Sequence, residues 1–118
     1  MTQLTRFVES IIQVGTDIIK NDNVDELDDL YTYLIEKTSD DNIKFDLLYV
    51  YSKLFLNACL YNKKNSLEFM YGIYSNLSDL EKMRLKDTII HGKYSIARLK
   101  NDDLIKWYSE TFLIYKSG

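Results

Sequence analysis

The sequence predicts an all-α protein on three observations. Proline is absent and glycine occurs four times, which leaves too few turn residues for a β-rich fold. Apolar residues make up 46% of the 118 positions and recur at spacings of three and four, the period of a helix with one buried face. Clusters of Asn, Asp, Ser and Lys interrupt this pattern five times. We therefore expect a single domain, residues 1–118, of six helices.

The first two helices are expected over residues 3–20 and 24–37. Apolar side chains between Leu4 and Ile19 form one stripe, which ends at the polar run from Lys20 to Asp22. Asn23 followed by Glu26 has the spacing of a capping box, which satisfies amides at the start of a helix.

The third helix, Phe45 to Tyr61, is the predicted centre of the fold. Its sequence FDLLYVYSKLFLNACLY is apolar almost all round, which is typical of a helix packed by neighbours on several sides. Lys53 and Asn57 lie inside it, and the run is short for a bilayer, so a membrane span is not expected.

Three more helices complete the expected fold. The fourth is expected to begin with a capping pair, Asn65 and Glu68, and the fifth with Ser78 and Glu81. The fifth is expected to continue to about Lys100, and after the break at Asn101–Asp103 a last helix is expected from Leu104 to Tyr115. The fifth helix has two apolar arcs, both expected to be packed: Met83, Ile90, Tyr94, Ala97 and Leu85, Ile89, Ile96, Leu99.

Long and short helices alternate with a period near 40 residues. The long helices end alike, at Asn21, Asn62 and Asn101. This period favours three antiparallel helical hairpins stacked as a short α-solenoid, in which the middle hairpin is covered on both sides. The alternative is an irregular six-helix bundle.

The composition gives little support to catalysis or to metal binding. Cys59 is the single cysteine and His91 the single histidine, too few for a His/Cys zinc site, and no Gly-rich phosphate loop is present. The acidic run Asp22–Asp29 is interpreted as a helix start, where carboxylates are favoured. We expect a protein that is not an enzyme, with no cofactor, no metal and no membrane contact. We place it in the cytoplasm of its own cell or of a host cell.

Charge is distributed unevenly along the chain. Residues 1–46 hold eleven acidic and four basic residues, and residues 47–118 hold seven acidic and eleven basic residues. On a straight fifth helix, four lysines would share one face as a basic ridge: Lys82, Lys86, Lys93 and Lys100. This ridge is expected to be either a solvated face or a binding site for an acidic partner or for nucleic acid.

Aromatic residues are numerous on the short helices. If the hairpins stack, six of them could form a continuous strip: Tyr31, Tyr33, Tyr71, Tyr74, Trp107 and Tyr108. Such residues either pack in the core or anchor a protein interface.

We predict a non-enzymatic protein–protein interaction module, an adaptor that binds a partner or forms an oligomer with itself. The alternative is a nucleic-acid-binding or nucleoprotein-complex subunit that uses the ridge. Abundant Ile, Lys, Asn and Tyr is typical of AT-rich genomes, and a small viral or phage accessory protein that engages a host factor is a special case.

Overall fold

The structure of the protein, a computed structural model, is described over residues 3–39 and 46–112. These residues form seven helices and no strand. In chain order the helices are α1 (Gln3–Lys20), α2 (Val24–Thr38), α3 (Leu47–Leu60), α4 (Lys64–Ser75), α5 (Asp79–Arg84), α6 (Lys86–Arg98) and α7 (Asp102–Phe112). The all-α prediction is confirmed. Phe45 and Tyr115, which the sequence assigns to helices, lie outside the described residues.

The described helices number seven rather than the predicted six, because the expected fifth helix divides at Leu85. The Leu85 backbone (φ −92°, ψ 0°) ends α5 and begins α6, and its side chain is buried. Just before the break, the Arg84 guanidinium pairs with the Asp46 carboxylate that caps α3. The break therefore coincides with a buried side chain and an ion pair to a distant residue, and helical periodicity reveals neither of them.

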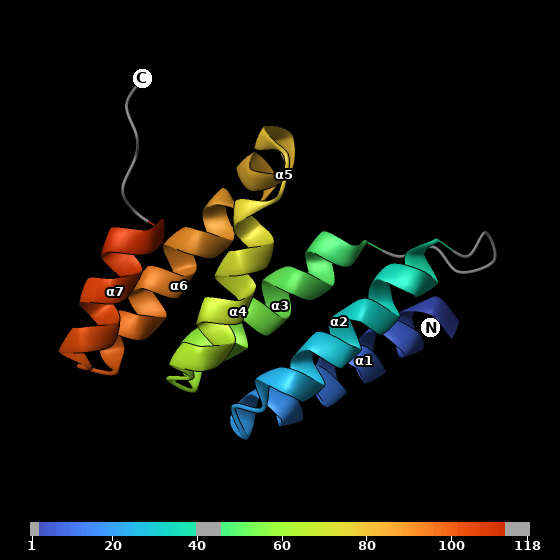
Figure 1. The fold of residues 1–118 in the computed structure, drawn as a ribbon, viewed down its shortest axis with the longest axis horizontal. Helices are drawn as coiled ribbons and strands as arrows, with labels where there is room; N and C mark the ends of the chain where they lie inside the picture. The colour runs from blue at the N-terminus through green and yellow to red at the C-terminus, as the bar shows by residue number, and fades with distance from the viewer. Residues whose placement is uncertain (1–2, 40–45, 113–118) are drawn as a thin grey trace.

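The helices are arranged around α3. Along one layer α3 packs between α1 and α6, and it also contacts α2 and α4. Helix α2 packs on α1, α4 on α3, and α7 on α6. Figure 1 shows the α1–α2 pair and the α6–α7 pair at opposite ends of the molecule, with α3 and α4 between them.

Helix α3 supplies much of the core, as its apolar sequence predicts. Half of its fourteen residues are buried: Leu48, Val50, Tyr51, Leu54, Phe55, Ala58 and Cys59. Its polar residue Asn57 is also accommodated, because its amide donates a hydrogen bond (2.7 Å) to Thr16 Oγ1 on α1. A helix with neighbours on several sides requires apolar residues around most of its circumference.

Three equivalent turns join α1 to α2, α3 to α4, and α6 to α7. Each contains a residue with positive φ two positions after the first helix: Asp22 (49°), Asn62 (61°) and Lys100 (54°). Asp and Asn tolerate this left-handed conformation better than most residues do. Neighbouring turns are also linked, because the Asn101 amide donates to Asn62 Oδ1 (2.9 Å).

The start of α4 corrects one sequence prediction. Asn65 does not cap this helix; Lys63 occupies the N-cap position and makes no side-chain capping bond. The cap comes instead from Asp22, whose Oδ1 accepts from the backbone amide (3.0 Å) and the hydroxyl (2.8 Å) of Ser66. The capping box of Ser78 and Glu81 is present as predicted. The hydrogen bonds that the Ser78 backbone amide and hydroxyl donate to the Glu81 carboxylate lower the pKa of this carboxyl.

Candidate protein-interaction grooves

The predicted aromatic strip is divided between two places. Tyr31 and Tyr33 lie on α2, where Tyr31 is half-buried and Tyr33 is 41% exposed. Tyr71 and Tyr74 on α4 and Trp107 on α7 are half-buried. Tyr108 is 1% exposed and its hydroxyl donates to the Ile89 carbonyl oxygen, so in this fold it is a core residue and no surface anchor.

Phe112, which the sequence analysis did not select, brings four of the six aromatic residues together. Its ring centroid lies 4.8–5.9 Å from the ring centroids of Tyr71, Tyr74, Trp107 and Tyr108. Several of these contacts are edge-to-face, an arrangement that aromatic pairs prefer. The cluster therefore fills the space between α4 and α7.

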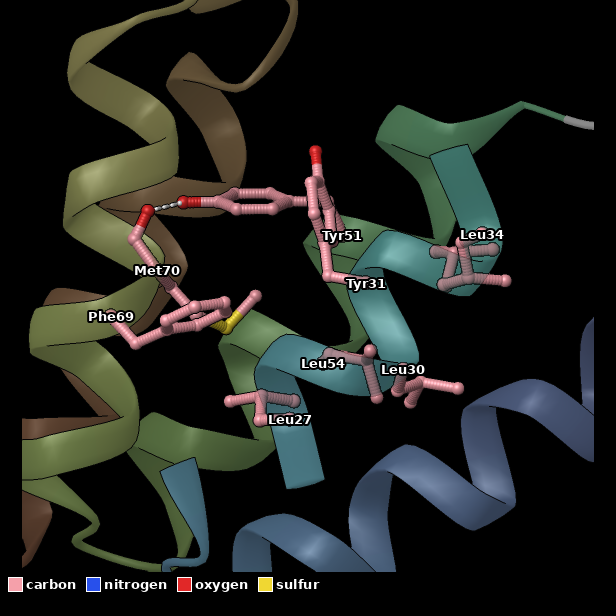
Figure 2. A pocket seen from close by; sticks show the side chains of 9 residues that line it. Leu27, Leu30, Tyr31, Leu34, Tyr51, Leu54, Phe69 and Met70 are labelled. Atoms are coloured by element: carbon pink, nitrogen blue, oxygen red, sulfur yellow. Dashed lines mark hydrogen bonds between the residues drawn. The ribbon is translucent and has the colours of Figure 1, made fainter. Parts of the chain in front are cut away.

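Tyr31 lines a small internal cavity of about 10 Å³ between α2, α3 and α4 (Figure 2). Figure 2 shows two hydroxyl groups among its lining residues, those of Tyr31 and Tyr51, and the Tyr51 hydroxyl donates to the Met70 carbonyl oxygen (2.6 Å). A cavity of this size holds about one water, which needs at least two polar partners. This cavity is therefore an apolar packing gap. The pKa of Tyr31 is raised, mainly because the side chain is partly buried and to a smaller extent because the Glu81 carboxylate is nearby.

The four predicted ridge lysines do not lie on one straight helix. Lys82 is on α5, Lys86 and Lys93 are exposed on α6, and Lys100 follows α6 with its backbone in the left-handed region. Lys82 is half-buried, with its Nζ 5.6 Å from the centroid of the Tyr74 ring. The break at Leu85 and the turn at Lys100 thus separate the four lysines into two helices and a loop.

One open groove nevertheless contains residues from both the predicted aromatic strip and the predicted basic ridge. We call it the C-terminal groove; it has a volume of about 240 Å³ and is lined by Tyr74, Asp79, Lys82, Met83, Lys86, Ile89, Ile90 and Phe112. Met83 is 70% exposed at this groove. An apolar surface beside two ammonium groups suits a ligand that is both apolar and acidic.

A second open groove lies between α3 and α6. This α3–α6 groove has a volume of about 460 Å³ and is lined by Leu56, Asn57, Leu60, His91, Tyr94, Ser95 and Arg98. Leu60 is 54% exposed and Tyr94 is 59% exposed.

The prediction that both apolar arcs of the fifth helix are packed is wrong: Leu85, Ile89 and Ile96 are buried, whereas Met83 and Tyr94 are mostly exposed.

The sequence offers one signal for these exposed positions. A helix at the end of a row has neighbours on fewer sides than a central helix, so part of an apolar circumference there remains uncovered. The α6 sequence carries apolar residues on two arcs, but α6 packs chiefly on α3 and α7. Knowing that α6 is a terminal helix would have identified Tyr94 as a surface residue.

Comparison with protein-family models, curated proteins and solved structures finds no match.

The remaining chemically active side chains are dispersed or buried. Burial raises the pKa of the Cys59 thiol to about 12, which keeps it protonated and unreactive at neutral pH. Within residues 3–39 and 46–112, no cluster of three His, Cys, Asp or Glu side chains is placed to hold a metal ion. None of the described helices is long and apolar enough to cross a membrane.

Proposed function

We propose that this chain is a non-enzymatic protein-interaction module whose C-terminal groove binds an acidic, partly apolar segment of a partner protein. The observation that supports this proposal is the meeting of two predicted features in one open groove. Tyr74 belongs to the aromatic set, and Lys82 and Lys86 belong to the basic set. Three more side chains add apolar surface to the same groove: Met83, Ile90 and Phe112.

Apolar contact would supply most of the affinity in this groove. Burial of apolar surface is worth roughly 25 cal/mol per Å², and a Met side chain can adapt to irregular partners. Met83 is the anchor we favour, because it is mostly exposed in the free protein and has the most area left to bury.

The lysines would orient the partner and speed its association. Lys82 is held over the Tyr74 ring, a cation–π geometry that limits the positions of its ammonium group. Asp79 also lines the groove, so the partner's carboxylates are expected near Lys82 and Lys86 and away from Asp79.

We further propose that the fold is three stacked antiparallel hairpins, α1–α2, α3–α4 and α6–α7, with α5 as an insertion. The equivalent positive-φ residues in the three turns and the hydrogen bonds between neighbouring turns support this arrangement. In such stacks the terminal hairpins have a free side, and extended binding surfaces are common.

The test compares two exposed residues of α5. We expect Met83→Ala to weaken binding of an acidic peptide about tenfold, equivalent to about 1.4 kcal/mol. Leu80→Ala is the matched control, because Leu80 is also 70% exposed on α5 but does not line the groove. The peptide is selected by phage display on the wild-type chain, and its dissociation constant is measured by fluorescence polarisation.

Two charge-reversal variants complete the design. Lys86→Glu should weaken the same peptide, whereas Lys93→Glu should not, since Lys93 is exposed on α6 but does not line the groove. Selected peptides without acidic residues, or equal effects of Met83→Ala and Leu80→Ala, would contradict the proposal. An oligonucleotide that binds the wild type, with affinity falling steeply with salt and lost in Lys86→Glu, would favour the nucleic-acid alternative instead.

A further inference from the structure

The α3–α6 groove has a distinct chemical character that the proposed function does not use. Its exposed apolar side chains are Leu60 and Tyr94, and its charged side chain is Arg98, with the His91 imidazole one turn before Tyr94. No acidic residue lines it, and α3 contains no Asp or Glu. Two exposed apolar side chains and one guanidinium group therefore lie together in this groove.

The opposite character is found on α2, at the other end of the molecule. Between Val24 and Thr38 this helix has five acidic residues and one basic residue. Asp25, Asp28, Thr32 and Ile35 are spaced by three, four and three residues, so they share one face, and all four are exposed. We call this the α2 acidic face. Ile35 is 47% exposed at its C-terminal end.

The helix dipole does not account for the whole of this face. Asp25 and Glu26 lie in the first turn of α2, where the dipole stabilises carboxylates. Asp28 and Ile35 lie beyond that turn, and an exposed carboxylate and an exposed isoleucine there gain nothing from the dipole. Their chemistry is complementary to the α3–α6 groove, which presents a guanidinium and apolar side chains.

We propose that a second copy of this chain places its α2 acidic face in the α3–α6 groove of the first. Ile35 packs against Tyr94 and Leu60, and Asp28 pairs with Arg98. Asp28 and Ile35 are about 10.5 Å apart along α2, and Tyr94 and Arg98 are about 6 Å apart along α6, so the long Arg98 side chain has to extend away from Tyr94 to reach Asp28.

This contact is head-to-tail. The groove and the acidic face are different surfaces of one chain, and Figure 1 shows α2 and α6 separated by α3 and α4. A heterologous interface of this type leaves one groove and one acidic face free after every addition, so it builds open chains or closed rings. It involves neither Met83 nor Lys86, so its success or failure is independent of the C-terminal groove.

The test uses two variants that block different halves of the contact. Arg98→Glu places a carboxylate in the groove and leaves α2 unchanged. Ile35→Asp replaces the apolar residue at the end of the α2 acidic face and leaves the groove unchanged. Sedimentation velocity should show wild-type mass rising with protein concentration and falling toward 14.0 kDa at high salt. Each variant alone should remain near 14.0 kDa.

Mixing the two variants is the decisive measurement. The intact acidic face of Arg98→Glu can enter the intact groove of Ile35→Asp, whereas the reverse pairing is blocked on both sides. The mixture should therefore form a complex of about twice the mass of one chain and grow no further. Lys93→Glu and Val14→Asp, which change exposed residues outside both surfaces, should assemble like the wild type.

Three results would overturn the proposal. The first is a wild-type chain that stays at one copy at low salt and high concentration, which would leave the groove to another partner. The second is a mixture that stays monomeric while circular dichroism shows both variants folded. The third is loss of assembly in Lys93→Glu or Val14→Asp equal to the loss in Arg98→Glu.

Discussion

Replacing Phe55 by Asp is expected to abolish the cooperative fold. The Phe55 side chain is completely buried on the central helix α3, and its ring lies 5.2 Å from that of Phe112 and 6.1 Å from that of Tyr108, measured between centroids. Loss of a buried phenylalanine costs about 3–5 kcal/mol, and burial of an unpaired carboxylate costs several more. The sum is comparable to the whole stability of a typical domain, about 5–15 kcal/mol.

Circular dichroism at 222 nm with urea titration measures this effect. Leu60→Asp is the control, because Leu60 is on the same helix but more than half exposed, and its free energy of unfolding should change by about 0.5 kcal/mol or less. Leu54→Asp should behave like Phe55→Asp, since Leu54 is also buried on α3. A cooperative urea transition in Phe55→Asp would show that α3 is not the centre of the fold.

Adding a single methyl group at Gly92 is expected to destabilise the protein by about 2–3 kcal/mol, an overpacking effect. A Cβ atom at this position would lie 2.5 Å from the Tyr108 hydroxyl oxygen and 3.0 Å from Cys59 Sγ and from Phe55 Cε1. The Tyr108 ring has little freedom to move, because it is buried and its hydroxyl donates to the Ile89 carbonyl oxygen. The higher helix propensity of alanine, worth about 1 kcal/mol, offsets only part of this cost.

A second glycine provides the matched control. A Cβ atom at Gly72 on α4 has no neighbour within 4 Å, so Gly72→Ala should stabilise the protein by about 0.5–1 kcal/mol. Both free energies come from urea titration. If Gly72→Ala and Gly92→Ala shifted stability in the same direction, the packing of α6 against α3 and α7 would be described incorrectly.

A double-mutant cycle identifies the cause. Tyr108→Phe removes the hydroxyl that the new methyl group would meet, so Gly92→Ala should cost less in that background than in the wild type. An equal cost in both backgrounds would assign the strain to Cys59 or Phe55 instead.

Local patterns were sufficient to predict most of the helices. Apolar spacing located α1, α2 and α3 within a few residues, and the Ser78–Glu81 pair located the start of α5. These signals act within one or two helical turns, through side chains on a shared face and through capping bonds. They are present in any segment of the chain taken alone.

The candidate site was only partly accessible to the same reasoning. The aromatic and basic residues were predicted as two separate binding sets, but Phe112 and Met83, which line one groove together with Tyr74, Lys82 and Lys86, were not selected. Tyr108 was selected and is buried. A tyrosine on a helix gives no local sign of whether its hydroxyl meets water or, as here, a carbonyl oxygen nineteen residues away.

The remaining features depend on residues distant in the chain. Asp22 caps a helix from 44 positions away, and the α5–α6 break at Leu85 accompanies an ion pair that spans 38 positions. The exposure of Tyr94 follows from the terminal place of α6 in its layer. Periodicity shows which side chains of a helix are apolar together, but the number of neighbouring helices determines how many of them are buried. That number is set by how all the helices pack, and no single segment contains it.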